Sequence, residues 1–124
     1  MDNAPISESQ ARAFADSWYA AWNAHNLQAI LAHYAPTIEH SSPFVSRYRA
    51  SDDLWIRGIA ALRDYFAHAL ERNPDLRFDP LHVAVGATSL VLVYRRMSGH
   101  IAAEVFYLNA EGKVVRSVSH YDRA

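Results

Sequence analysis

The sequence predicts an α+β fold in which helices come first and an antiparallel sheet follows. Between residues 11 and 70, three segments carry apolar side chains at helical spacing. Residues 76–121 instead divide into segments typical of strands, and turn residues separate them at 86–88, 98–99 and 109–112. The length of 124 residues fits one domain, which we expect to span residues 1–124.

The first two helices are predicted from their start signals. Ser7-Glu8-Ser9-Gln10 is a capping box, in which the Ser7 and Gln10 side chains bind free backbone N–H groups. The face that follows is apolar and consists of Ala11, Phe14, Trp18, Ala21 and Trp22. Asn26 can cap a shorter second helix that ends before Pro36. Its predicted inward side chains are Leu27, Ile30, Leu31 and Tyr34.

The rest of the chain is predicted as a short strand, a loop, a third helix and a sheet. Thr37–His40 alternates like a strand, whereas residues 45–57 show no period and are predicted to form a loop with Trp55 as its large side chain. Gly58 begins the third helix, which ends at Asn73-Pro74-Asp75. The four predicted strands are Leu76–Val85, Ser89–Met97, Ile101–Leu108 and Val114–Tyr121.

Composition excludes several classes of protein. A formal net charge of -1 argues against a nucleic-acid binder, because such proteins usually carry a basic stripe. No apolar run approaches the roughly 20 residues of a membrane span, and the first residues lack the pattern of a secretory signal. There is no Cys, no His-Glu-x-x-His spacing and no Gly-rich phosphate loop. We therefore expect a cytoplasmic protein with no metal, no cofactor, and neither nucleic acid nor membrane as a partner.

Three segments resemble one known superfamily. Residues 18–27, Trp-Tyr-Ala-Ala-Trp-Asn-Ala-His-Asn-Leu, look like the first-helix motif of the nuclear transport factor 2-like (SnoaL-like) superfamily. Residues 57–66, Arg-Gly-Ile-Ala-Ala-Leu-Arg-Asp-Tyr-Phe, look like its third helix, and residues 109–115, Asn-Ala-Glu-Gly-Lys-Val-Val, look like its final hairpin. The segments occur in the family's order. The resemblance implies a cone-shaped fold, with three N-terminal helices packed on a curved, mixed, mostly antiparallel sheet around a cavity.

Function does not follow from this resemblance, because members include ketosteroid isomerase, scytalone dehydratase, polyketide cyclases, limonene epoxide hydrolase and non-catalytic transport factors. Ketosteroid isomerase is the closest in pattern. Its general-base Asp ends a Val-Glu-Asp strand that Ile38-Glu39-His40 resembles, which implies His40 in the place of the base. The same comparison implies Glu104 in the place of its oxyanion-hole acid and Trp18 in the place of its oxyanion-hole Tyr. All three residues differ from the isomerase's own, which argues against steroid isomerisation.

His40 and Glu104 also suit proton chemistry on physical grounds. A neutral imidazole is well matched to proton transfer near pH 7, and a wall of Phe44, Trp18 and Trp22 would keep His40 neutral by desolvation. The alternative is a His that only forms a structural hydrogen bond. Glu104 shares a strand face with Ala102 and Phe106, where a carboxyl is costly to ionise and can stay protonated. The alternative is an ion pair with Arg95 or Arg96.

The last predicted strand has two faces. Val115, Ser117, Ser119 and Tyr121 form the face that we expect to line the cavity, by comparison with the family's Gly-Lys-Val-Val turn. Val114, Arg116, Val118 and His120 form the other face, on which family members commonly dimerise. We therefore expect a homodimer through the outer face of the sheet. The position of His120 on that face disfavours a His40–His120 pair.

The number of large aromatic side chains is the remaining indication of function, because they cannot all pack at the centre of one core. Their default role is core packing, but in a cone-shaped fold some would line a ligand cavity. The predicted ligand-binding residues are Trp22, Phe44, Trp55, Phe66, Phe106, Ser119 and Tyr121. Trp55 in its loop could cover the cavity.

Two functional hypotheses follow, and a third is weaker. The first is an enzyme that moves a proton on a small apolar, carbonyl-bearing or polyketide-like molecule, with His40 as base while Glu104 and the Trp18 N–H stabilise an enolate. Isomerisation, dehydration and cyclisation all fit those groups. The second is a non-catalytic binding domain with the same cavity, and the third is a dimerisation module with a filled core.

Overall fold

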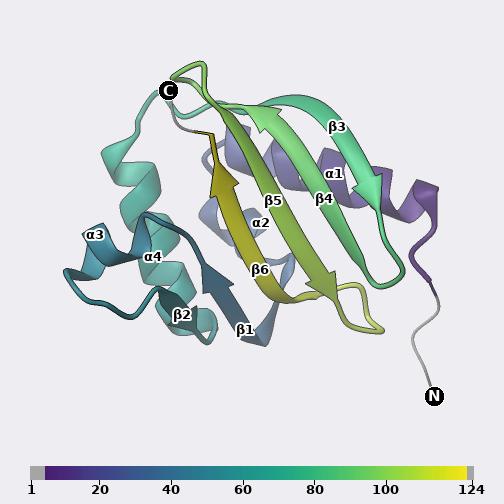
Figure 1. The fold of residues 1–124 in the computed structure, drawn as a ribbon, viewed down its shortest axis with the longest axis horizontal. Coiled ribbons are helices and arrows are strands. Elements are labelled where there is room, and N and C mark those ends of the chain that lie inside the picture. The colour runs from purple at the N-terminus through teal and green to yellow at the C-terminus, as the bar shows by residue number, and fades with distance from the viewer. Residues whose placement is uncertain (1–4, 123–124) are drawn as a thin grey trace.

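The computed structural model describes residues 5–122 and has the predicted α+β architecture, with helices packed on one side of a six-stranded sheet (Figure 1). The helices are α1 (Glu8–Asn23), α2 (Leu27–Leu31), α3 (Val45–Arg49) and α4 (Ile59–Arg72). The strands are β1 (Tyr34–Ser41), β2 (Trp55–Arg57), β3 (Asp79–Val85), β4 (Ser89–Arg95), β5 (Ile101–Leu108) and β6 (Val114–Tyr121). None of the helices in this part of the chain is long and apolar enough to cross a membrane.

The sheet is mixed and mostly antiparallel, as predicted. Its strand order is β2-β1-β6-β5-β4-β3, and the β1–β6 pair is the parallel one. Strand β1 comes before α4 in the chain, yet it pairs with β6, the last strand. The β1–β6 pairing therefore brings side chains from both halves of the chain to one face of the sheet.

Both predicted helix starts are confirmed by their capping bonds. The Gln10 backbone N–H donates to Ser7 Oγ over 3.1 Å, and the Ser7 N–H donates to Gln10 Oε1 over 2.8 Å. At α2, the Ala29 N–H donates to Asn26 Oδ1 over 3.0 Å. These bonds satisfy backbone donors that a helix start leaves without partners.

The turn between α1 and α2 is tied to the segment before β3. The Asn23 side chain donates from Nδ2 to the Phe78 carbonyl over 3.0 Å and accepts from the Phe78 N–H over 2.8 Å. His25, which has a left-handed backbone with φ 56°, places Nε2 2.8 Å from the Leu76 carbonyl oxygen. The Asn-Ala-His-Asn sequence therefore joins the end of α1 to the start of the meander.

Two element predictions are wrong in part. Residues 45–57 are not simply a loop, because they contain α3 and β2, which are too short to show a period. Tyr34 does not belong to the second helix but begins β1, and Pro36 lies inside that strand. The β1–β6 register shifts between Tyr34 and Glu39, and such an irregularity tolerates a residue that cannot donate a ladder hydrogen bond.

Smaller differences affect strand ends and one strand face. Strands β3 and β4 are shorter than predicted, whereas β5 and β6 have the predicted bounds. On β6 the predicted faces are correct for Ser117 and Ser119, which are buried, and for His120, which is exposed. They are wrong at the strand start, where Val114 is fully buried and Val115 is not. The register shift between Tyr107 and Leu108 inserts Val115 as an extra residue and reverses the alternation there.

Candidate functional site

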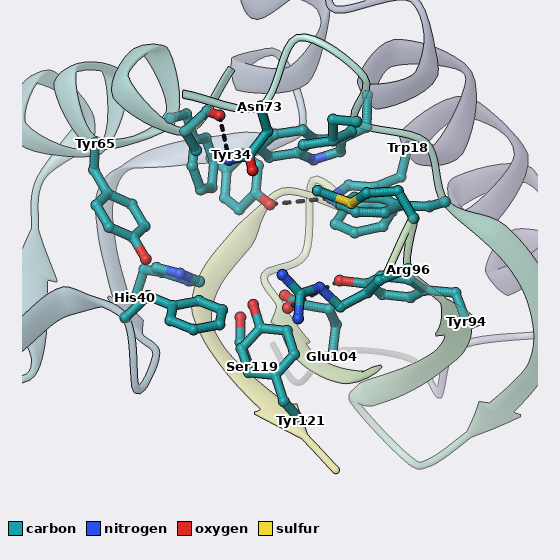
Figure 2. Close-up of a pocket in the computed structure, with 17 residues that line it drawn as sticks. Trp18, Tyr34, His40, Tyr65, Asn73, Tyr94, Arg96, Glu104, Ser119 and Tyr121 are labelled. Atoms are coloured by element: carbon teal, nitrogen blue, oxygen red, sulfur yellow. Dashed lines mark hydrogen bonds between the residues drawn. The ribbon is translucent and has the colours of Figure 1, made fainter. Parts of the chain in front are cut away.

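A cavity of about 100 Å³ lies between the helices and the inner face of the sheet (Figure 2). Its wall is mostly aromatic, with a few polar groups, and combines residues from α1, β1, α4 and β4–β6. The lining residues are Trp18, Trp22, Tyr34, His40, Phe44, Tyr65, Phe66, Ala69, Asn73, Leu76, Phe78, Tyr94, Arg96, Met97, Glu104, Ser119 and Tyr121. An apolar wall with few convergent polar groups is typical of small-molecule sites.

His40 lies near the end of β1 and is only 3% exposed. Its Nδ1 is 2.7 Å from the Ser117 Oγ, and its ring packs against Tyr65 and Phe66, with centroids 5.7 and 5.6 Å away. Burial lowers the His40 pKa to about 4, so the ring is neutral at pH 7. When Nδ1–H donates to Ser117, Nε2 carries a lone pair that no hydrogen bond within residues 5–122 engages. His40 can therefore accept a proton. The rings that pack against it are those of Tyr65 and Phe66, and not those of the predicted Phe44, Trp18 and Trp22.

Glu104 reaches the same cavity from β5 and is 4% exposed. The Tyr94 hydroxyl donates to its Oε1 over 3.5 Å, and Ser119, its cross-strand partner on β6, also bonds to the carboxyl. Burial outweighs both contacts and raises the Glu104 pKa to about 7. Glu104 therefore holds a proton over much of the range below neutral pH and can donate a hydrogen bond.

The alternative of a Glu104 ion pair is not observed within the described residues. Arg95 is exposed and donates to the Gly99 carbonyl. Arg96 does line the cavity, but its guanidinium lies over the rings of Phe44 and Tyr121. In Figure 2, Arg96 and Glu104 lie on one side of the cavity, and His40 and Tyr65 lie on the other.

The Trp18 indole does not act as the sequence predicts. Its Nε1–H donates to the Tyr34 hydroxyl over 3.0 Å, so it is already engaged inside the protein. Tyr34 also lines the cavity, and its own hydroxyl proton remains available because the oxygen accepts from Trp18. Burial raises the Tyr34 pKa far above its usual range, which keeps that proton in place. Trp18 therefore positions a donor, and Tyr34 is the donor that can reach a ligand.

Most of the predicted ligand-binding residues line this cavity, but two do not. Those that do are Trp22, Phe44, Phe66, Ser119 and Tyr121. The Trp22 Nε1–H is buried without a hydrogen-bond partner in the described chain, so it is a further donor on the wall. Phe106 is fully buried farther along β5, beneath Phe14 and Trp18, and does not border the cavity.

Trp55 lies on the opposite side of the sheet and cannot cover the cavity from there. It pairs with Ser41, and Ser41 pairs with Val118, which places Trp55 on the outer face. The Arg116 guanidinium lies 4.5 Å from its ring centroid on that face. Trp55 reaches this position because β2 is an edge strand rather than a free loop.

Several wall residues were missed by sequence reasoning. The sequence pattern predicts Tyr34 in a helix, and Tyr65 belongs to the third-helix motif, which indicates the fold and not a place in the cavity wall. Tyr94 could have been found, because it alternates with the buried Leu90 and Leu92. His120 is exposed, which agrees with its predicted position on the outer face. Within residues 5–122, no group of three or more His, Cys, Asp or Glu side chains is placed to hold a metal ion.

Comparisons with known proteins identify the family. The model of the SnoaL-like domain matches residues 15–124. A SnoaL-like protein of unknown function from Burkholderia thailandensis is 36% identical, with a TM-score of 0.92, and the match covers 96% of this chain and 99% of that one. No match was found among the curated proteins.

Two more distant structures share the fold. A putative isomerase of the SnoaL-like family from Agrobacterium tumefaciens is 18% identical, with a TM-score of 0.73 and coverage of 93% of this chain and 99% of that one. TerC, co-crystallised with polyporic acid, is 16% identical, with a TM-score of 0.74 and coverage of 91% and 92%. The match of the family model over most of the chain and the 36% identical relative lead to one conclusion: this chain belongs to the SnoaL-like domain family.

Proposed function

We propose that this protein is an enzyme that binds a small apolar, carbonyl-bearing molecule in its cavity and moves a proton on it. The observation that carries the proposal is that His40 and Glu104 line one cavity with pKa values of about 4 and about 7. Two titratable groups whose environments separate their pKa values are typical of an acid–base pair. Between these values His40 is an unprotonated base while Glu104 is a protonated donor.

The proposed step is an enolisation. His40 Nε2 removes a proton from the carbon next to the carbonyl, and the C–H electron pair moves into an enolate. The Glu104 carboxyl and the Tyr34 hydroxyl donate hydrogen bonds to the carbonyl oxygen, where negative charge develops. Return of the proton to another carbon gives an isomerisation, loss of a β-hydroxyl as water gives a dehydration, and attack on a second carbonyl gives a cyclisation.

The wall around these groups supports the same chemistry. Apolar rings exclude water, so hydrogen bonds to an enolate oxygen are stronger than in solution. Trp18 fixes the Tyr34 hydroxyl and Ser117 fixes the His40 ring, so neither group must reorganise during the step. Among distant relatives of the same fold, one is named a putative isomerase, and TerC was co-crystallised with the small molecule polyporic acid.

The test uses a ketone small enough for the cavity, cyclohex-3-en-1-one, whose conversion to the conjugated enone is followed by ultraviolet absorbance. We expect turnover by the wild type, and we expect His40→Asn and Glu104→Gln each to lower kcat by about 10²- to 10³-fold with little change in KM. The matched control is His120→Asn, an exposed His on the outer face, which should leave turnover unchanged.

The alternative is a non-catalytic binding domain that uses the same cavity. It would be favoured if the wild type bound such ketones without turnover and His40→Asn weakened binding alone. A third possibility is a dimerisation module, which would be favoured if no ketone bound. Absence of turnover across β,γ-unsaturated, β-hydroxy and 1,5-diketone substrates would refute the enzyme hypothesis.

A further inference from the structure

A groove of about 550 Å³ lies next to the cavity, lined by residues of α3 and α4 and by Arg96, which follows β4. The groove and the cavity share the wall residues Phe44, Tyr65, Ala69, Asn73 and Arg96. The cavity and the groove are therefore adjacent, and a molecule held beside His40 and Glu104 lies next to the groove.

The groove is basic. Arg47, Arg72, Arg96 and His68 line it, and no acidic side chain does so in the part of the chain that the structure describes. None of these three arginines forms a salt bridge within residues 5–122. The arrangement differs from that of the neighbouring arginines of the α3–β2 region, since Arg49 and Arg57 both bind Asp53, over 3.3 and 3.0 Å.

Aromatic rings hold two of these guanidinium groups by their faces. The Arg96 guanidinium lies 5.2 Å from the Phe44 centroid and 4.7 Å from that of Tyr121, and those two rings are themselves 4.7 Å apart. The Arg47 guanidinium lies 5.5 Å from the Phe44 centroid. Stacking occupies the face of a guanidinium and leaves its N–H edge free, and that edge matches the two oxygens of a carboxylate or phosphate.

Size is a second, independent indication. Sites for ligands of ordinary metabolite or drug size measure about 300–1,000 Å³. The cavity alone, at about 100 Å³, is below that range, whereas the cavity and the groove together fall within it. The cavity therefore has room for a small reacting part, and the adjacent groove, which the arginines line, has room for a larger remainder.

We propose that this site takes an amphipathic anion, with an apolar carbonyl-bearing part in the cavity and a carboxylate or phosphate in the groove. Arg96, which borders both the cavity and the groove, binds the anionic group, and Arg47 and Arg72 add positive charge to the groove. The nature of the reacting part rests on the proposed function. The preference for an anion rests on the groove alone.

The experiment is an NMR titration of the full chain with three probes of one ring size: benzoate, phenyl phosphate and the neutral benzamide. We expect at least one anion to bind about 10-fold more tightly than benzamide, because hydrogen bonds between a guanidinium and an anion are stronger than those to a neutral amide. Comparison of benzoate with phenyl phosphate shows which anion the groove prefers. Added NaCl should weaken binding of the anions more than binding of the amide.

Arg96→Gln and Arg72→Gln should each reduce the affinity for the preferred anion by about 5- to 10-fold. Arg72→Gln, which lies outside the cavity, should leave benzamide binding unchanged. Arg72 is exposed, so its replacement keeps the test valid even if the partly buried Arg96 also supports folding. The matched control is Arg63→Gln, which removes the same charge from an exposed position of α4 outside the groove.

The proposal is overturned if neither anion binds more tightly than benzamide, or if the arginine variants weaken the anion no more than Arg63→Gln does. Its failure is distinguishable from failure of the proposed function. Anion preference without any ketone turnover would refute the enzyme hypothesis and support the anion-binding groove. Turnover of neutral ketones with no anion preference would support the enzyme hypothesis and refute the anion-binding groove.

Discussion

At the scale of single residues, burial is the largest influence on the pKa values of His40 and Glu104 and shifts them in opposite directions. Desolvation penalises the charged form of each group, so it lowers the pKa of the imidazole and raises that of the carboxyl. Near pH 6 both side chains are therefore mostly uncharged, although they are an acid and a base in one cavity. An uncharged pair avoids the cost of two buried ions while keeping one acceptor and one donor for a ligand.

This arrangement predicts a bell-shaped pH profile for kcat/KM with limbs near pH 4 and pH 7. Below about pH 4 the rate should fall because His40 gains a proton and no longer accepts one. Above about pH 7 it should fall because Glu104 loses the proton that it donates. Steady-state rates between pH 3.5 and 9 measure both limbs, and Glu104→Gln should remove the upper one. A rate that instead rises through pH 7 would make the Glu104 carboxylate the base.

The sequence identified these two residues but not their partners. His40 and Glu104 lie on strands whose alternation and family resemblance predicted an inward direction. The Trp18 prediction located the right side chain but not its bond, because no pattern in the sequence pairs Trp18 with Tyr34. Such a bond depends on how α1 crosses β1, which is a property of packing.

At the scale of elements, Asn23 makes two of the three side-chain hydrogen bonds that join the end of α1 to the segment before β3, and His25 makes the other. The Asn23 side chain forms hydrogen bonds with both the N–H and the carbonyl of Phe78. It therefore replaces the hydrogen bonds that a neighbouring strand would otherwise make with this backbone segment. The buried rings of Trp18 and Phe78 stack beside it, with centroids 5.7 Å apart. Asn23 therefore helps to set the position of an aromatic wall of the cavity.

We expect Asn23→Ala to lower the free energy of unfolding by about 2 kcal/mol, because two partly buried backbone groups lose their partners. Urea denaturation followed by tryptophan fluorescence measures this change. Gln28→Ala on the exposed side of α2 is the control and should change stability by less than about 0.5 kcal/mol. An equal effect of the two substitutions would show that the Asn23 bridge contributes nothing.

Element predictions from the sequence were accurate where a period extends over many residues and poor elsewhere. Helix α4 and strands β5 and β6 show clear periods and were placed well. Helix α3 and strand β2, with 5 and 3 residues, carry too few positions to show one. The bulge at Val115 could not be predicted from the sequence of β6, because a bulge depends on how the strand pairs with its neighbour.

At the scale of the whole molecule, the outer face of the sheet carries a row of apolar side chains. Ala84, Val91, Val105 and Val118 form one continuous cross-strand row on β3–β6, and the three valines are half-buried. Tyr107 beside this row is 42% exposed. A monomer seldom exposes such a continuous apolar surface, so the row is where we expect two copies to meet.

We therefore predict that the protein is a homodimer through this face and that Val105→Asp makes it monomeric, because two buried carboxylates would face each other without partners. Sedimentation velocity measures the change in mass. Glu111→Gln in the β5–β6 turn is a control for altered charge and should remain dimeric. A wild type that sediments as a monomer at about 100 µM would refute the prediction.

The parallel pairing of β1 with β6 has a consequence for how the protein is made. Ser117 follows His40 by 77 positions, so the ribosome synthesises the base long before the residue that orients it. Until β6 emerges, β1 has only the three-residue β2 as a partner and leaves its other edge unpaired. Cavity assembly must therefore follow translation of the last strand, and nascent chains that stop short of it present a bare edge to chaperones.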